Sequence, residues 1–344
     1  MALLRHMVDA GDRWALLEAT SHGLALHRLD TIPFAVGAVT FVTQDHLDFH
    51  RSVAAYRRAK AILFERVAER GGVAVINDDD PASRAMRAYT GDARVISYSA
   101  AGRPVDVRAS EVSSDLSGTR FTLSLPAGST PIALPLLGEY NVANALCAAA
   151  VAFAIGVPLA EIARGLNAAE PIPGLLVRVD AGQPFLVLVD EGKLAPQLVS
   201  AIEVARHLAP AGRIIVLVGA SDGGGRTLTR QKGEIVAMAA DYAVFTTQLA
   251  VAADPAALVA QIAAGARAAG GIEDETFSCV VDRREAIAHA LRIAQPGDCV
   301  LLTGKGVEDE LTVGATTYPW DEAAVARQIL AELGYGGPLS DRTG

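Results

Sequence analysis

Short apolar runs alternate along this chain with segments whose apolar residues recur at helical spacing. Near the N-terminus, Trp14 to Leu17 and Val36 to Val42 are apolar runs, and such runs predict buried strands. Ser52 to Ala68 carries its apolar residues on one stripe, which predicts an amphipathic helix. Residues 2–10 predict a further helix that ends at Gly11. The first part of the chain therefore predicts strands in alternation with helices.

The next part of the chain predicts a strand, a β-rich region and a long buried helix. Residues 71–78 form an apolar strand pattern that leads into an acidic cluster. This cluster could meet a metal ion, but Asp80 directly before Pro81 favours a turn and a helix N-cap. Residues 93–135 consist of short alternating runs separated by Gly, Ser and Pro, which are typical of hairpins. Val142 to Ala154 predicts an alanine-rich buried helix.

The second half of the chain repeats a strand followed by a helix. This alternation runs from residue 185 to a last predicted helix at 321–333, and it predicts a parallel doubly wound sheet. The segment 170–176 is punctuated by Pro and Gly and separates the two halves. We therefore expect two domains, at residues 1–172 and 173–344.

Composition and charge narrow the function classes. Hydrophobic residues make up 51% of the 344 residues, and the net charge of -9 argues against a nucleic-acid partner, which requires a basic face. The three cysteines lie apart within apolar segments, as buried thiols do in a reducing compartment. No apolar run is long enough to cross a bilayer, and no signal peptide is visible. We expect a cytoplasmic protein that contacts neither membrane nor nucleic acid.

Charged residues gather where the first two predicted strands end. Glu18 follows the first strand, Asp45 and His46 follow the second, and Lys60 lies two turns into the next helix. Functional groups gather at the carboxyl ends of strands in open α/β sheets. Oxygen ligands with one imidazole favour Mg²⁺ or Mn²⁺ over a soft metal. The alternative is that Asp45 is a helix N-cap, the histidines are ordinary loop residues and Lys60 is solvated.

Three motifs in this stretch resemble the central domain of the Mur ligases. They are Glu-Ala-Thr-Ser-His at 18–22, Asp-His-Leu-Asp-Phe-His at 45–50 and Tyr-Arg-Arg-Ala-Lys at 56–60. The resemblance is greatest to the member that adds the third residue of the peptidoglycan peptide. It implies that Glu18 and His46 bind Mg²⁺, and that Lys60 is carbamylated and supports a second Mg²⁺. Lys60 and His46 would then be catalytic.

The resemblance continues into the regions where the family binds ATP. Tyr-Asn-Val-Ala-Asn-Ala at 140–145 is similar to a family helix whose second asparagine, Asn144 here, reaches the adenine. Asp190 stands where the family binds the ribose, and Lys193 takes the place of a histidine. Arg226 is a loose counterpart of an arginine in a family loop. The ligands that the resemblance implies are ATP and a molecule like a UDP-muramoyl peptide.

The fold that the resemblance implies is α/β. It consists of a Mur ligase central domain shortened at its N-terminus, with a P-loop-type parallel sheet and a small β subdomain, followed by a Rossmann-like C-terminal domain. Some positions depart from the family pattern: the link motif Gly-Arg-x-Glu is Gly174 to Val177, and the motif that recognises the amino acid is Thr247 to Ala250. No Gly-x-x-x-x-Gly-Lys-Ser/Thr loop, which would cradle the ATP phosphates, occurs in the sequence.

Three interpretations of this pattern remain. The first, which we favour, is a Mur-ligase-like pseudoenzyme that keeps its binding cleft and is inactive alone. The second is a functional amide-bond ligase whose N-terminal part is missing or is supplied by a partner chain. The third is an unrelated enzyme that binds a dinucleotide at the glycine-rich loop 219–225, whose spacing differs from Gly-x-Gly-x-x-Gly. We also expect an exposed sheet edge that is a candidate surface for a homodimer.

Overall fold

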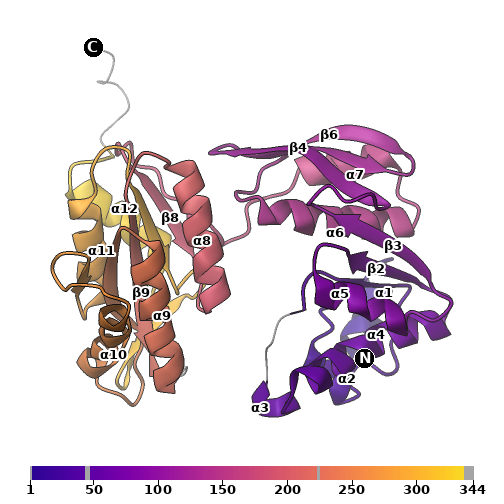
Figure 1. Cartoon of the computed structure of the whole chain (residues 1–344), viewed down its shortest axis with the longest axis horizontal. Coiled ribbons are helices and arrows are strands. Elements are labelled where there is room, and N and C mark those ends of the chain that lie inside the picture. The colour runs from indigo at the N-terminus through magenta and orange to yellow at the C-terminus, as the bar shows by residue number, and fades with distance from the viewer. Residues whose placement is uncertain (1, 43–46, 223–224, 337–344) are drawn as a thin grey trace. The chain divides into compact units, whose positions relative to one another are not determined.

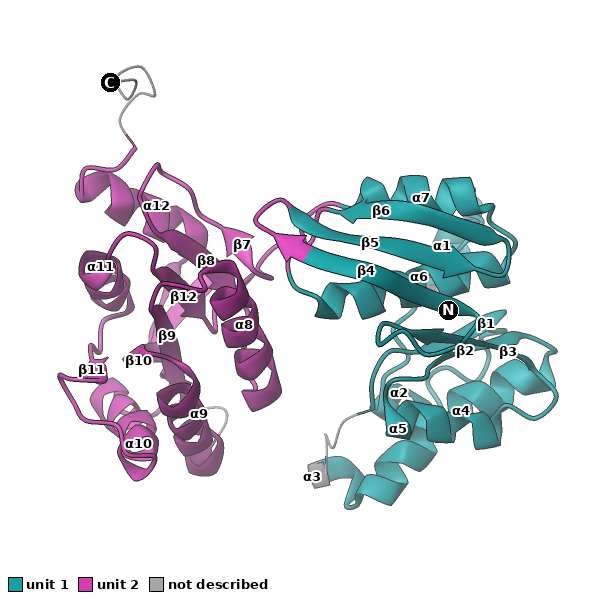
Figure 2. Cartoon of the chain, turned by 45° about the horizontal axis from the view of Figure 1, so that its top comes forward, with its two compact units in different colours: residues 1–113, 118–134, 138–169 teal, residues 114–117, 135–137, 170–344 magenta. Residues whose placement is uncertain are grey.

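The computed structural model describes residues 2–42, 47–222 and 225–336, which divide into two compact units (Figure 2). Unit 1 consists of residues 1–113, 118–134 and 138–169, and unit 2 of residues 114–117, 135–137 and 170–344. Each unit encloses hydrophobic clusters of its own. Within the described ranges, no helix combines the length and the apolarity that a membrane span requires.

Unit 1 is built on a six-stranded sheet in the order β1-β2-β3-β4-β5-β6 (Figure 1). Its strands are β1 (Val36–Val39), β2 (Val73–Asn77), β3 (Arg94–Ser99), β4 (Val107–Asp115), β5 (Gly118–Leu125) and β6 (Gly128–Leu134). Its helices are α1 (Ala2–Asp9), α2 (Ser21–Ala25), α3 (Leu47–His50), α4 (Val53–Glu69), α5 (Pro81–Ala85), the 3-10 helix η1 (Met86–Tyr89), α6 (Tyr140–Ala154) and α7 (Leu159–Asn167). The pairs β1–β2, β2–β3 and β3–β4 are parallel, and the pair β5–β6 is antiparallel. The predicted parallel sheet with a β subdomain is confirmed.

Helix α4 forms where the apolar stripe predicts it. Ser52 is its N-cap, and the Ser52 hydroxyl accepts the backbone N–H of Ala55 at 3.1 Å. Tyr56 and Phe64 on its inner face are buried in one cluster with residues of β1 and β2. This packing holds the helix that carries Lys60 against the sheet.

Asp80 is the N-cap of α5, as the sequence favours. Its carboxylate accepts the backbone N–H groups of Ala82 and Ser83, and also that of Val42 at 3.1 Å. Burial acts to raise the pKa of Asp80, but these hydrogen bonds outweigh it and hold the pKa below its ordinary value. Asp80 therefore ties the end of β2 to the chain that leaves β1.

The predicted strand at Trp14 to Leu17 is wrong. This segment forms no strand, and the side chains of Trp14 and Leu16 are 64% and 96% exposed. A strand needs the backbone groups of a neighbour, and in the described part of the sheet β1 pairs with β2 alone. Apolar composition cannot supply that neighbour.

Unit 2 is a doubly wound sheet in the order β11-β10-β9-β12-β8-β7. Its strands are β7 (Val177–Arg178), β8 (Leu186–Asp190), β9 (Ile214–Ser221), β10 (Tyr242–Leu249), β11 (Phe277–Cys279) and β12 (Cys299–Thr303), with a separate hairpin of β13 (Glu310–Val313) and β14 (Thr316–Pro319). Its helices are α8 (Ala195–Leu208), α9 (Gly225–Ala239), α10 (Pro255–Ala268), α11 (Arg283–Ile293) and α12 (Glu322–Glu332). All paired strands of the large sheet are parallel except β7 with β8. The predicted doubly wound sheet is confirmed, and the hairpin is an addition.

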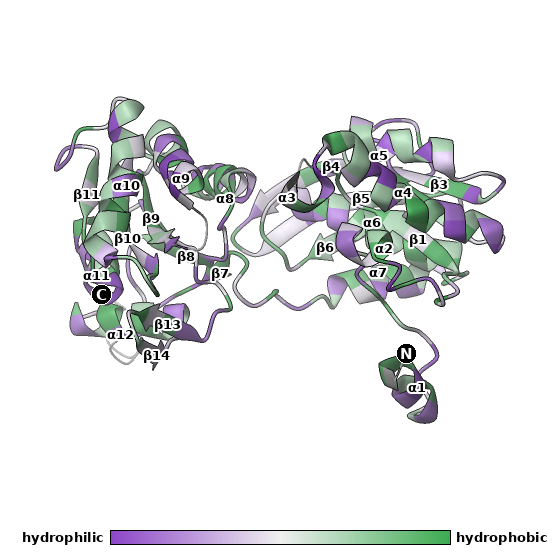
Figure 3. Cartoon of the chain, turned by 90° about the horizontal axis from the view of Figure 1, so that it is seen from below, coloured by the Kyte–Doolittle hydropathy of each residue, from purple (hydrophilic) through white to green (hydrophobic). Residues whose placement is uncertain are grey.

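The helices of unit 2 cover both faces of its sheet. Helices α8, α9 and α10 share one hydrophobic cluster with the strands, and α11 and α12 share the other. Figure 3 shows that β9 and β10 are hydrophobic along most of their length. Strands buried on both faces have such continuous apolar runs, which is why their positions can be predicted from the sequence.

Helices α9 and α10 meet backbone to backbone at two glycines. A Cβ atom on Gly233 would lie 1.9 Å from the carbonyl oxygen of Ile262, and one on Gly265 would lie 2.0 Å from that of Arg230. Neither position has space for a side chain. The contact fixes α9, and with it Lys232, the residue next to Gly233.

A buried ion pair joins α11 to α12. The side chains of Arg283 and Glu322 are 0% and 1% exposed, and Nη2 lies 2.6 Å from Oε1. Arg283 also donates to the carbonyl oxygen of Thr303 at 2.7 Å, at the end of β12. Because each buried charge requires its partner, this pair fixes the first residues of both helices at the carboxyl edge of the sheet.

Candidate functional site

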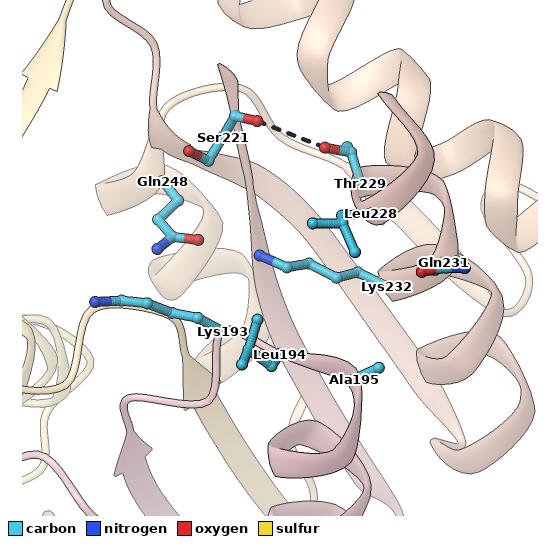
Figure 4. A pocket seen from close by; sticks show the side chains of 9 residues that line it. All are labelled: Lys193, Leu194, Ala195, Ser221, Leu228, Thr229, Gln231, Lys232 and Gln248. Carbon is cyan, nitrogen blue, oxygen red and sulfur yellow. Dashed lines mark hydrogen bonds between the residues drawn. The ribbon is translucent and has the colours of Figure 1, made fainter. Parts of the chain in front are cut away.

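Unit 2 contains a pocket of about 190 Å³ near the carboxyl ends of β9 and β10 (Figure 4). Its walls come from the loop before α8, the first residue of α8, helix α9 and the two strand ends. The lining residues are Lys193, Leu194, Ala195, Ser221, Leu228, Thr229, Gln231, Lys232 and Gln248. Ligands of open parallel sheets bind outside the carboxyl ends of the strands, so the position of this pocket favours a binding site.

Lys232 brings a positive charge into this pocket. Its side chain runs from α9 toward Gln248 (Figure 4). Burial is the largest cause that lowers the pKa of Lys232, and the nearby positive charges of Lys193 and Arg283 add to it; with Glu308 acting in the opposite direction, the pKa lies at about 8. Among the described residues, none lies within hydrogen-bonding or ion-pair distance of its Nζ.

Gln248 lies across the pocket from Lys232, near the end of β10. It is 5% exposed, and its Nε2 donates to the carbonyl oxygen of Gly304 at 2.8 Å. That bond fixes the orientation of the amide. Its Oε1 is buried without a hydrogen-bond donor among the described residues, and it faces the side on which Lys232 lies (Figure 4).

Lys193 is neutralised by two carboxylates. Its Nζ lies 2.6 Å from an oxygen of Glu308 and 3.0 Å from one of Glu191. Burial acts to lower the pKa of Lys193, but its hydrogen bonds to these carboxylates outweigh burial and raise the pKa above its ordinary value. Glu308 also binds Lys305, which is 1% exposed, at 2.7 Å. The predicted nucleotide contact of Lys193 therefore competes with an existing ion-pair network.

Asp190 is buried at the end of β8 and is 5% exposed. Its Oδ1 accepts the backbone N–H of Gly192 at 2.7 Å, and its Oδ2 accepts that of Leu176 at 3.1 Å. Burial raises the pKa of Asp190 by more than these hydrogen bonds lower it. The carboxylate thus attaches the segment around Leu176 to the sheet. The contact of Asp190 with a ribose stays a prediction.

Two other predicted nucleotide contacts are exposed. Asn144 lies on α6 of unit 1, and its Nδ2 donates to Oδ1 of Asn141 at 3.0 Å. Arg226 lies in the first turn of α9 of unit 2. The predicted glycine loop 219–225 includes residues 223 and 224, which lie outside the described residues.

The predicted metal site belongs to unit 1. Glu18 is exposed two residues before Thr20, the N-cap of α2, and Lys60 is half-buried on α4. The Nζ of Lys60 lies 5.4 Å from the ring centroid of Tyr56. His46 lies outside the described residues. The described residues hold no group of three or more His, Cys, Asp or Glu that could bind a metal ion, and the site stays a prediction.

Lys232 is not among the site residues that the sequence predicts. One signal could have identified it, because it falls on the same stripe of α9 as the buried residues Thr229, Gly233 and Val236. Lysine is almost never fully buried unless it is paired. Gln248 is noticeable in the sequence only because it belongs to Thr247 to Ala250, the segment that differs from the motif that recognises the amino acid.

Comparisons with known proteins agree with both units. A family model described as the Mur ligase middle domain matches residues 1–152. A second model, described as the Mur ligase, glutamate ligase domain, matches residues 176–306.

Individual relatives match nearly the whole chain. The UDP-N-acetylmuramyl-tripeptide synthetase of Roseiflexus sp. (strain RS-1) is 42% identical over 348 residues, which cover 98% of this chain and 68% of the relative. The UDP-N-acetylmuramoyl-L-alanyl-D-glutamate–2,6-diaminopimelate ligase of Bacillus licheniformis is 34% identical, with 96% of this chain and 67% of the relative covered. A solved structure of a UDP-N-acetylmuramoyl-L-alanyl-D-glutamate–2,6-diaminopimelate ligase superposes with a TM-score of 0.67 at 25% identity, covering 96% of this chain and 67% of that one. The chain thus spans about two thirds of the length of these relatives.

Proposed function

The chain belongs to the Mur ligase family, and from that premise we propose that it carries metal-binding and nucleotide-binding residues of an ATP-dependent amide-bond ligase of peptidoglycan synthesis. The observation that carries the proposal is the 42% identity to a tripeptide synthetase along 98% of the chain. The substrates of this class are a UDP-N-acetylmuramoyl peptide and an amino acid.

Glu18, His46 and carbamylated Lys60 are the residues that would hold Mg²⁺. Carboxylate and carbamate oxygens are hard ligands, so the chemistry of this donor set fits the ion. Lys60 is half-buried, and among the described residues no carboxylate lies within 4.0 Å of its Nζ to neutralise it. Carbamylation would turn this unpaired cation into the additional oxygen donor that the site requires. Bound Mg²⁺ would neutralise charge on the phosphates of ATP.

Asn144, Asp190, Lys193 and Arg226 are the residues that would contact the nucleotide. The exposed amide of Asn144 can both donate and accept hydrogen bonds, as recognition of an adenine edge requires. Asp190 already accepts two backbone N–H groups, so a ribose hydroxyl would use one of its remaining lone pairs.

We propose further that a polypeptide of these 344 residues does not form amide bonds by itself. The sequence contains no Gly-x-x-x-x-Gly-Lys-Ser/Thr loop. Phosphoryl transfer depends on positioning and electrostatic stabilisation, and that loop supplies both. Loss of contacts of this kind typically lowers a rate by about 100-fold to 1,000-fold each.

Phosphate release tests the proposed inactivity. Wild-type protein and the Lys60→Ala variant are incubated with ATP, Mg²⁺, UDP-N-acetylmuramoyl-dipeptide and candidate amino acids. We expect equal phosphate release from both proteins. Faster release by the wild type would contradict the proposal and favour the second interpretation, a functional ligase.

Calorimetric titration with ATP and Mg²⁺ tests the nucleotide contacts separately. We expect binding that Asn144→Ala weakens by about tenfold, the effect of one lost hydrogen bond. Gln328→Ala is the matched control, because it removes an exposed amide of α12. Equal heats from all three proteins, or no heat at millimolar ATP, would show that the residues carried over from the family do not bind the nucleotide.

A partner chain that supplies the phosphate loop would explain why this chain keeps its binding residues although it does not form amide bonds by itself. If ATP binds and no phosphate is released, addition of such a chain should restore release in the wild type and not in Lys60→Ala.

We also propose the free edge of β1, which has one neighbour in the described sheet, as a homodimer surface. A mass measured by light scattering that stays monomeric at all concentrations would exclude that dimer.

A further inference from the structure

The pocket of unit 2 contains a cation, Lys232, that pairs with no carboxylate of the described residues. Lys193 is held by two carboxylates and Lys305 by Glu308 and the carbonyl oxygen of Glu310. The Nζ of Lys232 has no such partner among the described residues. A half-buried ammonium group without a counter-charge is costly, and a bound anion would remove that cost.

The first turn of α8 adds donors to the same pocket. Helix α8 has 14 residues, and its N-cap, Leu194, has no side-chain acceptor for the N–H groups of the first turn, which are those of Ala195 and Gln197 because Pro196 has none. The side chain of Gln197 accepts from the backbone N–H groups of Lys193 and Leu194, which precede the helix, and so leaves the donors of the first turn free. Leu194 and Ala195 both line the pocket. An uncapped helix N-terminus favours an anion through its N–H groups and its dipole.

Gln248 supplies the observation that points to a particular kind of anion. Its Oε1 is an acceptor, is buried without a donor among the described residues, and faces the pocket (Figure 4). Its Nε2 is committed to Gly304, so the amide cannot turn over without losing that bond. A ligand that satisfies Oε1 must therefore carry a hydrogen-bond donor as well as a negative charge.

The walls and the volume limit the size of the ligand. Leu194, Ala195 and Leu228 form the apolar part of the lining, and the volume is about 190 Å³. This space suits a small group, and the apolar lining leaves charge recognition to Lys232 and the first turn of α8.

We propose that this pocket binds a small oxyanion that carries a hydroxyl group, with the negative oxygens toward Lys232 and the first turn of α8 and the hydroxyl toward Oε1 of Gln248. Hydrogen phosphate, a phosphate monoester and a hydroxycarboxylate share this chemistry. The site lies wholly within unit 2 and shares Lys193 with the proposed nucleotide contacts, but it goes beyond the proposed function because it requires neither ATP nor metal.

Nuclear magnetic resonance of selectively labelled lysines tests the site in the full chain. The sequence has four lysines, Lys60, Lys193, Lys232 and Lys305, so each side-chain signal can be assigned from one variant. Four sodium salts are titrated at constant ionic strength: phosphate against sulfate, which lacks a proton at neutral pH, and lactate against propanoate, which lacks the hydroxyl. We expect phosphate, lactate or both to raise the pKa of Lys232 from about 8 by roughly one pH unit. Sulfate should have a smaller effect than phosphate, and propanoate a smaller effect than lactate.

The Lys232→Met variant removes the charge, and Arg230→Met is its control on the same helix, since Arg230 is exposed and does not line the pocket. We expect thermal stabilisation by the preferred anion to disappear in Lys232→Met and to persist in Arg230→Met. A Lys232 signal that responds to no anion would overturn the proposal. Equal responses to phosphate and sulfate and to lactate and propanoate would overturn the role of Gln248. The outcome is independent of ligase activity, because no substrate of the ligase is present.

Discussion

At the scale of single residues, Asp298 shows how one carboxylate can hold several segments together. Its side chain is 5% exposed and accepts the backbone N–H groups of Arg213 and Gln295, and it binds the guanidinium of Arg213 through Nε at 3.1 Å and Nη2 at 2.7 Å. Burial acts to raise the pKa of Asp298, but these bonds outweigh it and leave the pKa below the ordinary value of 3.8. The ionised form is therefore the one that stabilises the fold.

We expect the stability that Asp298 contributes to be present above about pH 4 and to be lost as the pH falls through the lowered pKa. The unfolded state binds the proton first, so acid favours unfolding. Asp298→Asn should lower the free energy of unfolding at pH 7 by roughly 2 kcal/mol or more, since a hydrogen bond to a charged group contributes about 1.5–3 kcal/mol. The loss of unfolding free energy caused by Asp298→Asn should be smaller below pH 4. Urea unfolding at pH 7 and pH 3 measures both effects.

Asp180→Asn is the control for that prediction, because Asp180 is an exposed residue paired only with nearby groups. Exposed pairs contribute little, so this variant should unfold within about 0.5 kcal/mol of the wild type at both pH values. A penalty for Asp298→Asn that does not change between pH 7 and pH 3 would contradict the assigned role.

Residues with a local role could be predicted from the sequence, and residues whose role depends on distant neighbours could not. Asp80 could be identified as an N-cap because Pro81 follows it directly. The stripe of α9 could mark Lys232 as partly buried, but not as a pocket residue, because the rest of the lining comes from α8 and β10, far from it in the sequence. Asp190 could be placed at a strand end, but its bond to Leu176 depends on how the link segment folds back.

At the scale of elements, the sequence predicts most strands and helices because their apolar patterns are continuous. The exceptions depend on partners. Trp14 to Leu17 has the composition of a strand and no neighbour in the described sheet. The hairpin of β13 and β14 has few buried residues, so it lacks the apolar pattern by which a strand is recognised. Element type thus follows from the local pattern, whereas pairing requires the whole sheet.

The contact between α9 and α10 gives a prediction at this scale. Gly233→Ala should lower the free energy of unfolding by about 1–3 kcal/mol, because the new Cβ would meet the carbonyl oxygen of Ile262 and force the helices apart. Gly165→Ala is the matched control: Gly165 is also helical, in α7, and a Cβ there would have nothing within 4 Å. That variant should be more stable than the wild type by about 0.4–1 kcal/mol.

Urea unfolding of the two glycine variants measures the difference. Opposite signs would support the assigned contact, since both substitutions add the same methyl group to a helix. Equal stabilisation by both substitutions would show that α9 and α10 can separate without a loss of stability. The close approach of their backbones would then contribute nothing to the free energy of unfolding.

At the scale of the whole molecule, each of the two units has its own hydrophobic clusters. A unit with its own core can unfold as a separate cooperative body. We expect calorimetry of the full chain to show two thermal transitions. Asp298→Asn should lower the melting temperature of one transition, because Asp298 belongs to unit 2.

Tyr98→Phe is the corresponding variant of unit 1, where the Tyr98 hydroxyl donates to the carbonyl oxygen of Val39 at 3.0 Å and the side chain is fully buried. Loss of that hydrogen bond should cost about 1 kcal/mol and lower the other transition. A single transition that both variants shift equally would show that the two units unfold as one body.

The glycine contact between α9 and α10 also determines how the pocket beside Lys232 could be engineered. Because Gly233 excludes any side chain, the α9 wall cannot be moved by substitutions at the helix interface without a loss of stability. Leu194 and Leu228, which line the pocket and are each 47% exposed, are free of that constraint. A library at these two positions would change the size preference of the pocket while its charged end stays in place.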